Sequence, residues 1–100
     1  MTDRRLKLDS ILREICPNVY FNPPESIKLI YPCILYKRSV ANTRYADNIT
    51  YTFMMNYQLT LIDRDPDNDM IDKILKLPLC RFDRHYIADK LSHDVFDIYY

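Results

Sequence analysis

Residues 51–63, YTFMMNYQLTLID, carry bulky side chains at the odd-numbered positions and smaller or polar side chains mostly at the even-numbered ones. This two-residue period is typical of a long β-strand with one buried face. In a chain of 100 residues, such a strand has to lie within a sheet that forms the core. A chain of this length holds one hydrophobic core, so we expect a single domain covering residues 1–100.

Helical and strand patterns flank this central strand. Apolar residues recur at helical spacing over 2–15, and the pattern stops at Pro17. The segment 27–37 is rich in Ile, Leu and Tyr and predicts a strand, which Pro32 marks as an edge strand or a bulged one because proline cannot donate to the ladder. The residues 39–48 between the two strands predict either an exposed hairpin tip or an arm that contacts a neighbouring subunit.

An acidic turn, DRDPDND at 63–69, follows the central strand and has two interpretations. Its alternating carboxylates resemble the start of an EF-hand calcium loop, but Asn68 stands at the glycine position and Ile74 at the position of the bidentate glutamate. Asp and Asn also cap helices and complement the helix dipole at its N-terminus. Capping is therefore the favoured interpretation, for a helix over 67–77 with Met70, Ile71, Ile74, Leu75 and Leu77 facing inward.

Two further strands are predicted over 79–87 and 92–100, joined by a short turn at 88–91. The expected fold is α+β, with a mainly antiparallel sheet of about four strands and two helices packed on one face. The helix over 67–77 could also make a crossover between strands that are not adjacent. The strand order stays open at this point.

The composition excludes several function classes. The chain contains no glycine, which excludes the standard P-loop, the dinucleotide-binding loop and the hydrolase nucleophile elbow. Fourteen basic and fourteen acidic residues give a net charge of zero, which disfavours a dedicated nucleic-acid binder. The sequence has no apolar run long enough to predict a signal peptide or a membrane span. We therefore expect a soluble protein that is intracellular when made.

The titratable side chains allow one enzymatic alternative. His85, His93 and Asp94 could form the site of a small metal-dependent or His/Asp hydrolase if they converge. We expect the two histidines to be cross-strand neighbours, a position that also fits ordinary hydrogen bonding. Cys80 is expected on the opposite strand face from Arg81 and His85, as a buried thiol and not a nucleophile. Cys16 and Cys33 are likewise expected to be free thiols.

The nine tyrosines are a stronger signal than any titratable cluster. Tyrosine combines a large apolar area with a polar tip and is enriched at protein interfaces. A monomer of this size does not readily bury so many, so some are expected to face another subunit. The aromatic end at Tyr99 and Tyr100 predicts a docked C-terminal strand.

The segments YPCILYKR, ADNITYTFMMNYQLTLIDRDPDND and LPLCRFDRHYIADKLSHDVFDIYY, in this order, resemble the small tail terminator proteins of tailed bacteriophages, also described as neck, tail-completion or minor tail proteins. The resemblance covers 27–100. It implies a non-enzymatic virion protein that forms a ring, with six copies, on the head-proximal end of the tail tube. Such a ring stops tube growth and joins the tail to the head-completion or connector proteins.

The same resemblance implies the partners and the location. The partners would be other copies of the chain, the tail tube protein and a head-completion protein, with contact to a tail sheath left open. Genomic DNA would pass through the lumen without specific binding, and assembly would take place in the host cytoplasm. No cofactor, metal, catalytic residue or membrane contact is expected. The interface candidates lie in the predicted loops and at the aromatic end: Arg38, Asn42, Arg44, Tyr45, Asp47, Arg64, Asp65, Asp67, Tyr99 and Tyr100.

Overall fold

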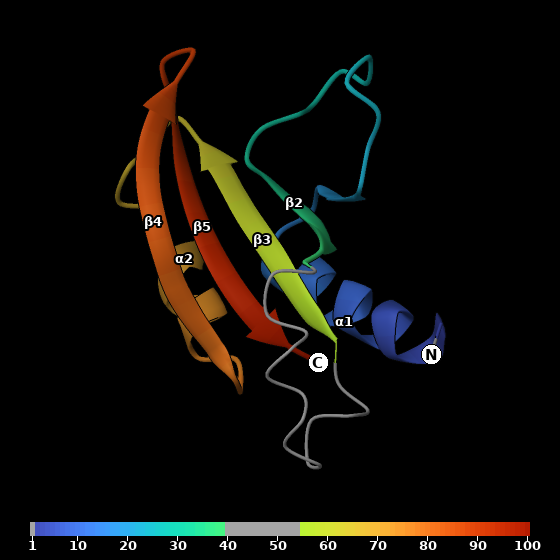
Figure 1. The fold of residues 1–100 in the computed structure, drawn as a ribbon. Helices are drawn as coiled ribbons and strands as arrows, with labels where there is room; N and C mark the ends of the chain where they lie inside the picture. The colour runs from blue at the N-terminus through green and yellow to red at the C-terminus, as the bar shows by residue number, and fades with distance from the viewer. Residues whose placement is uncertain (1, 40–54) are drawn as a thin grey trace.

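The computed structural model describes residues 2–39 and 55–100. These ranges contain two helices and five strands: α1 (Thr2–Ile15), β1 (Val19–Phe21), β2 (Cys33–Arg38), β3 (Asn56–Asp63), α2 (Met70–Leu75), β4 (Cys80–Ala88) and β5 (Leu91–Tyr99). Both helices lie on the same side of a single twisted sheet (Figure 1). The expected α+β class and the placement of the helices on one face are therefore confirmed. Within these ranges, neither helix is long and apolar enough to cross a membrane.

The sheet has five strands in the order β1-β2-β3-β5-β4, one more than expected. The additional strand, β1, lies at one edge and pairs in parallel with β2, whereas every other pairing is antiparallel. Its three residues are too few to show a strand period, which is why the sequence pattern missed it. After α1 the chain turns, and β1 then runs beside β2 in the same direction.

Strand β2 begins at Cys33, so the strand predicted over 27–37 starts about six residues too early. Pro32 has no amide proton for a ladder, and the hydrogen-bonded pairing with β3 begins only after it. The expectation that Pro32 marks an edge or bulged strand is wrong, because β2 lies between β1 and β3 and Pro32 precedes it. Residues 40–54 lie outside the described residues, and they include most of the predicted arm and the first part of the strand predicted over 51–63.

The hydrophobic core lies between the sheet and the two helices. The odd-numbered residues Tyr57, Leu59 and Leu61 of β3 are all buried in it, as the two-residue period predicted. Helix α1 contributes Leu8 and Leu12, which are fully buried. Its apolar stripe therefore packs on the sheet, as expected from the helical spacing.

Helix α2 covers only 70–75 of the predicted 67–77, and it connects β3 to β4 across the intervening strand β5. Ile74 is fully buried, whereas Leu75, predicted to face inward, is 40% exposed. The acidic turn before the helix acts as a cap in part: the side-chain oxygen of Asn68 accepts a hydrogen bond from the Met70 amide at 2.7 Å. Asp69 makes no side-chain cap hydrogen bond.

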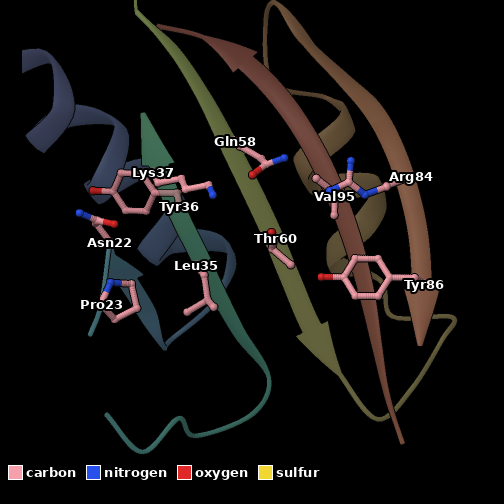
Figure 2. Close-up of a pocket in the computed structure, with 10 residues that line it drawn as sticks. All are labelled: Asn22, Pro23, Leu35, Tyr36, Lys37, Gln58, Thr60, Arg84, Tyr86 and Val95. Atoms are coloured by element: carbon pink, nitrogen blue, oxygen red, sulfur yellow. The ribbon is translucent and has the colours of Figure 1, made fainter. Parts of the chain in front are cut away.

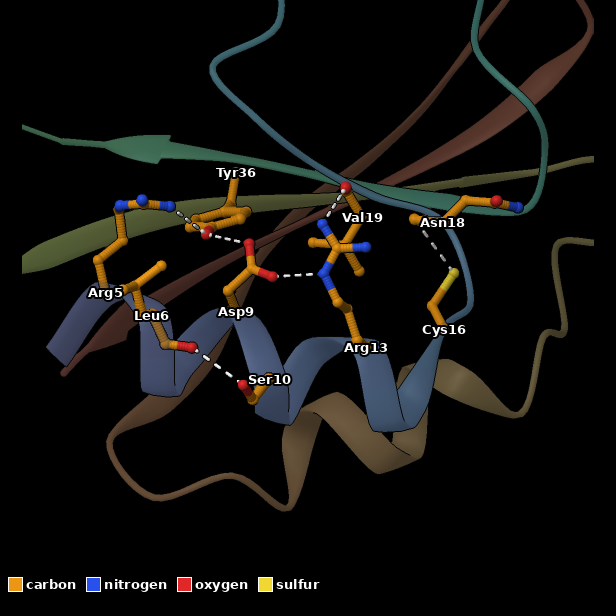
Figure 3. Close-up of polar contacts among 9 residues, drawn as sticks. All are labelled: Arg5, Leu6, Asp9, Ser10, Arg13, Cys16, Asn18, Val19 and Tyr36. Atoms are coloured by element: carbon orange, nitrogen blue, oxygen red, sulfur yellow. Dashed lines mark hydrogen bonds and ion pairs between the residues drawn. The ribbon is translucent and has the colours of Figure 1, made fainter. Parts of the chain in front are cut away.

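A polar network attaches α1 to the sheet (Figure 3). The Tyr36 hydroxyl donates to Asp9 Oδ2 at 2.6 Å, and Arg5 Nη1 donates to the same hydroxyl at 3.1 Å. Arg13 binds the other oxygen of Asp9 and also donates to the Val19 carbonyl at 3.2 Å. Because Tyr36 is 1% exposed, this network fixes the position of the helix over β1 and β2.

The network shifts the acidities of its members. Burial alone would raise the pKa of Asp9, but hydrogen bonds from Tyr36 and Arg13, together with the charges of Arg13 and Arg5, outweigh it and lower the pKa. Burial and the bond to Asp9 raise the pKa of Tyr36 to about 12. The structure thus favours an ionised Asp9 that accepts a hydrogen bond from a neutral Tyr36.

Substitution of Tyr36→Phe should lower the free energy of unfolding at neutral pH by about 2 kcal/mol, because a buried hydrogen bond to a charged group is lost. Urea denaturation followed by circular dichroism measures the change. The matched control is Tyr20→Phe, whose hydroxyl accepts only an exposed bond at 3.4 Å from the Ile30 amide, and it should change the stability much less. Equal effects of the two substitutions would contradict the role of the network.

The same network predicts a pH dependence. Since the pKa of Asp9 is lowered on folding, its contribution to stability is present above the usual value of 3.8 and is lost as the pH falls through the lowered pKa. Asp9→Asn should therefore reduce the slope of stability against pH in the acid range. An unchanged slope in urea titrations between neutral and acid pH would refute this assignment.

Candidate functional site

The sheet face turned away from the helices carries both polar and apolar side chains, and the strand register organises them into rows. One row runs across four strands as Leu35, Thr60, Val95 and Arg84. The next row begins with Lys37 and Gln58 and continues through Asp97 to Arg81. In each row the side chains come from β2, β3, β5 and β4 in turn. The four strands thus present a surface that none of them forms alone.

A shallow groove of about 380 Å³ lies on this face. We call it the polar groove and define it by Leu35, Lys37, Gln58, Thr60, Arg84 and Tyr86. Figure 2 shows Lys37 and Arg84 extending toward each other from strands on either side of β3. Val95 lies in the same surface but is only 1% exposed, and it forms part of the floor.

The groove lining contains two cationic side chains, Lys37 and Arg84, and no carboxylate. Asp97 lies next to it in the neighbouring row, where its partial burial and the charge of Asp83 raise its pKa against the opposing effect of Arg81 and Arg84. Arg84 also contacts the exposed Asp83 at 3.1 Å. The groove itself therefore offers positive charge, amide and hydroxyl groups to a ligand.

A second polar feature lies on the helix-bearing face. Asp94 is 5% exposed, and its Oδ1 lies 2.8 Å from Nδ1 of His85. The contact joins the edge strand β4 to β5 and provides a partner for a buried carboxylate. His93, which precedes Asp94 in β5, lies on the opposite face, where its ring stacks on Tyr86 at 4.7 Å between centroids.

The residues of the hydrolase alternative are therefore not brought together. The register pairs His85 with Asp94 and Tyr86 with His93, so the two histidines are not directly opposed as expected. His93 is separated from the other two side chains by the sheet because consecutive strand residues point to opposite faces. Among the described residues, no group of three or more His, Cys, Asp and Glu side chains is placed to hold a metal ion.

Cys80 lies on the same sheet face as His85, which corrects the expected placement. A β-bulge between Phe82 and Arg84 shifts the alternation of β4 by one residue. The β5 partners of the two residues, Ile98 and Asp94, are four positions apart, which corresponds to about 13 Å. Burial raises the pKa of Cys80 to about 11, so the thiol stays protonated at neutral pH. Cys16 and Cys33 are buried free thiols, as expected.

The interface candidates lie at two ends of the sheet. Arg38 ends β2 and Tyr99 ends β5, beside the first residues of β3. Tyr100 is held there through its amide, which donates to the Met55 carbonyl at 2.9 Å. Arg64, Asp65 and Asp67 are exposed in the turn that follows the last residue of β3. The other four candidates, Asn42, Arg44, Tyr45 and Asp47, lie outside the described residues.

The edge strand β4 is exposed along its length. Its residues from Arg81 to Ile87 are all exposed, and they include three large hydrophobic side chains: Phe82 at 45%, Tyr86 at 42% and Ile87 at 69%. A long exposed edge strand is a surface that proteins normally cover or protect. Here the bulge and the charges of Arg81, Asp83 and Arg84 protect the first half. The second half presents Ile87 on the helix-bearing face and Tyr86 on the opposite face.

Sequence reasoning missed the polar groove. The polar even-numbered residues Gln58 and Thr60 already indicated that one face of β3 is not in the core. Lys37 and Arg84 could not be added to them, because their proximity depends on the strand order and on the bulge in β4. Comparisons with models of protein families, with curated proteins and with solved structures give no match.

The separation of His85 from His93 predicts that these two residues do not form a zinc site together. A calorimetric titration with Zn²⁺ should give no binding heat, and Co²⁺ should give no new visible absorption. Stoichiometric binding that is lost in both His85→Ala and His93→Ala would contradict the geometry. Binding lost in only one of the two variants would point to a site that the hydrolase alternative does not describe.

Proposed function

We propose that the chain is a structural virion protein that acts as a tail terminator. Copies of it, six in number, form a ring on the head-proximal end of the tail tube, stop tube polymerisation and join the tail to head-completion or connector proteins. The ring lies in the neck region of the virion, and genomic DNA passes through its lumen without specific binding. The protein carries out no catalysis.

The observation that carries this proposal is the exposed apolar surface of β4 on its helix-bearing face, where Ile87 is 69% exposed and Phe82 is 45% exposed. A subunit of an assembly buries such side chains against its neighbour, which supplies the hydrophobic contribution to association. The order of segments that resembles the terminator family supports the same assignment. The interface candidates within the described residues lie at the two ends of β3. This placement also supports a ring, because a ring subunit contacts its two neighbours through two different patches.

The direct test is the tail length in cells infected by a phage that lacks this protein. If the protein stops tube growth, electron micrographs should show overlong tubes without heads, and expression of the protein from a plasmid should restore the normal length. Tails of normal length that join to heads in its absence would refute the proposed function. The measurement does not depend on whether the free protein is monomeric.

The β4 surface has a test of its own. Ile87→Lys should prevent ring formation and capping, because a charge replaces an apolar side chain that the neighbour would cover. The control is Ile30→Lys, a substitution in the loop before β2 at a residue that is 63% exposed. Both variants should fold, since substitutions at exposed positions change stability by less than about 0.5 kcal/mol.

Negative-stain images and light scattering of the protein with purified tail tubes measure the outcome. A capped tube with Ile87→Lys and an uncapped tube with Ile30→Lys would reverse the assignment of the surface. Loss of capping in the first variant alone is the expected result.

A further inference from the structure

The polar groove offers a positively charged surface that the proposed function leaves unassigned. Lys37 and Arg84 flank it from β2 and β4, with Gln58 and Thr60 of β3 between them (Figure 2). The backbones of the two flanking strands are three strand spacings apart, about 14 Å. Because the lining has no carboxylate, a matching ligand is an acidic segment.

The chain itself carries a segment of this chemistry in the acidic turn, in the residues 64–69 that follow β3. Asp65, Asp67 and Asp69 are all exposed there. The turn is ordered by its own side chains: Asp65 Oδ1 accepts from the Asp67 amide at 2.9 Å, and Asn68 binds the Asp63 carboxylate. A segment already held in one conformation loses little entropy when it binds. The preformed turn therefore presents the side chains of Asp67 and Asp69 to a partner.

The acidic turn and the polar groove lie on different parts of the subunit. The turn follows the last residue of β3, whereas the groove lies on the face of the sheet around Gln58 and Thr60. A contact between the turn of one copy and the groove of the next uses two different patches. Such a heterologous contact repeats from subunit to subunit and closes into a ring when the rotation permits.

We propose that the acidic turn of one subunit docks in the polar groove of the adjacent subunit, with Asp67 and Asp69 facing Lys37 and Arg84. This inference names the intersubunit contact of the ring and therefore rests on the proposed function. The contact sets the register and the partner of each subunit, while the apolar surface of β4 supplies buried area. Its ionic character makes the assembly sensitive to salt.

Charge reversal tests the contact. The groove variant carries Lys37→Glu and Arg84→Glu, and the turn variant carries Asp67→Lys and Asp69→Lys, which leaves the Asp65 bond intact. Each variant alone places like charges together, and its dissociation constant should rise by roughly tenfold or more. An equimolar mixture of the two variants should assemble again when the variants alternate. The native turn of the groove variant then meets the native groove of the turn variant, and the reversed turn of the turn variant meets the reversed groove of the groove variant.

The measurement is sedimentation velocity with light scattering, at low and high salt, on proteins whose fold is checked by circular dichroism. The control variant, Lys7→Glu with Lys28→Glu, changes charge by the same amount at exposed positions outside the groove, and it should assemble like the wild type. The inference is overturned if the wild type stays monomeric at millimolar concentration, if the single-patch variants assemble normally, or if their mixture stays monomeric. Tail length in infected cells is scored separately, so rings that survive charge reversal refute the contact and leave the proposed function standing.

Discussion

The ladder between β3 and β5 is the interaction on which the rest of the structure depends. Its eight residue pairs run from Asn56 opposite Tyr99 to Asp63 opposite Ser92. Because β5 occupies the place beside β3, the chain that leaves β3 has to cross to the far side of β5 before it forms β4. Helix α2 makes this crossing on the same face as α1, and it brings Ile74 into the core. The pairing thereby determines which face the helices cover and which strand becomes the edge.

The same ladder builds the surfaces to which we assign function. Rows of side chains cross the face opposite the helices because β2, β3, β5 and β4 are aligned in register, and the polar groove is one product of that alignment. The edge position of β4 exposes Tyr86 and Ile87. The acidic turn projects from the end of β3, away from the groove. The apolar edge, the cationic groove and the acidic turn thus lie in three places on the subunit, which is the arrangement on which the proposed head-to-tail contacts rest.

Local patterns predicted those elements whose side chains have a clear period. Helix α1 has the predicted bounds, and the two C-terminal strands lie within about one residue of their predicted ends. The sequence pattern failed at elements whose length, start or facing depends on local irregularities or on strand pairing. β1 is too short to show a period, Pro32 delays the start of β2, and the bulge in β4 moves His85 to the face of Cys80. At the candidate site, the exposed acidic turn was predictable, but its cationic counterpart was not.

The sequence by itself determined the class of structure and the kinds of site that it excludes. The two-residue period of β3, the helical spacing of α1 and the lack of glycine required a sheet with covering helices and excluded phosphate-binding loops that depend on glycine. Only the tertiary structure decided that Lys37 and Arg84 flank one groove and that His85 meets Asp94 instead of His93. The physical reason is that a periodic pattern specifies which face of a strand is buried, whereas neighbours across a sheet are chosen by strand order and register, which depend on long-range packing.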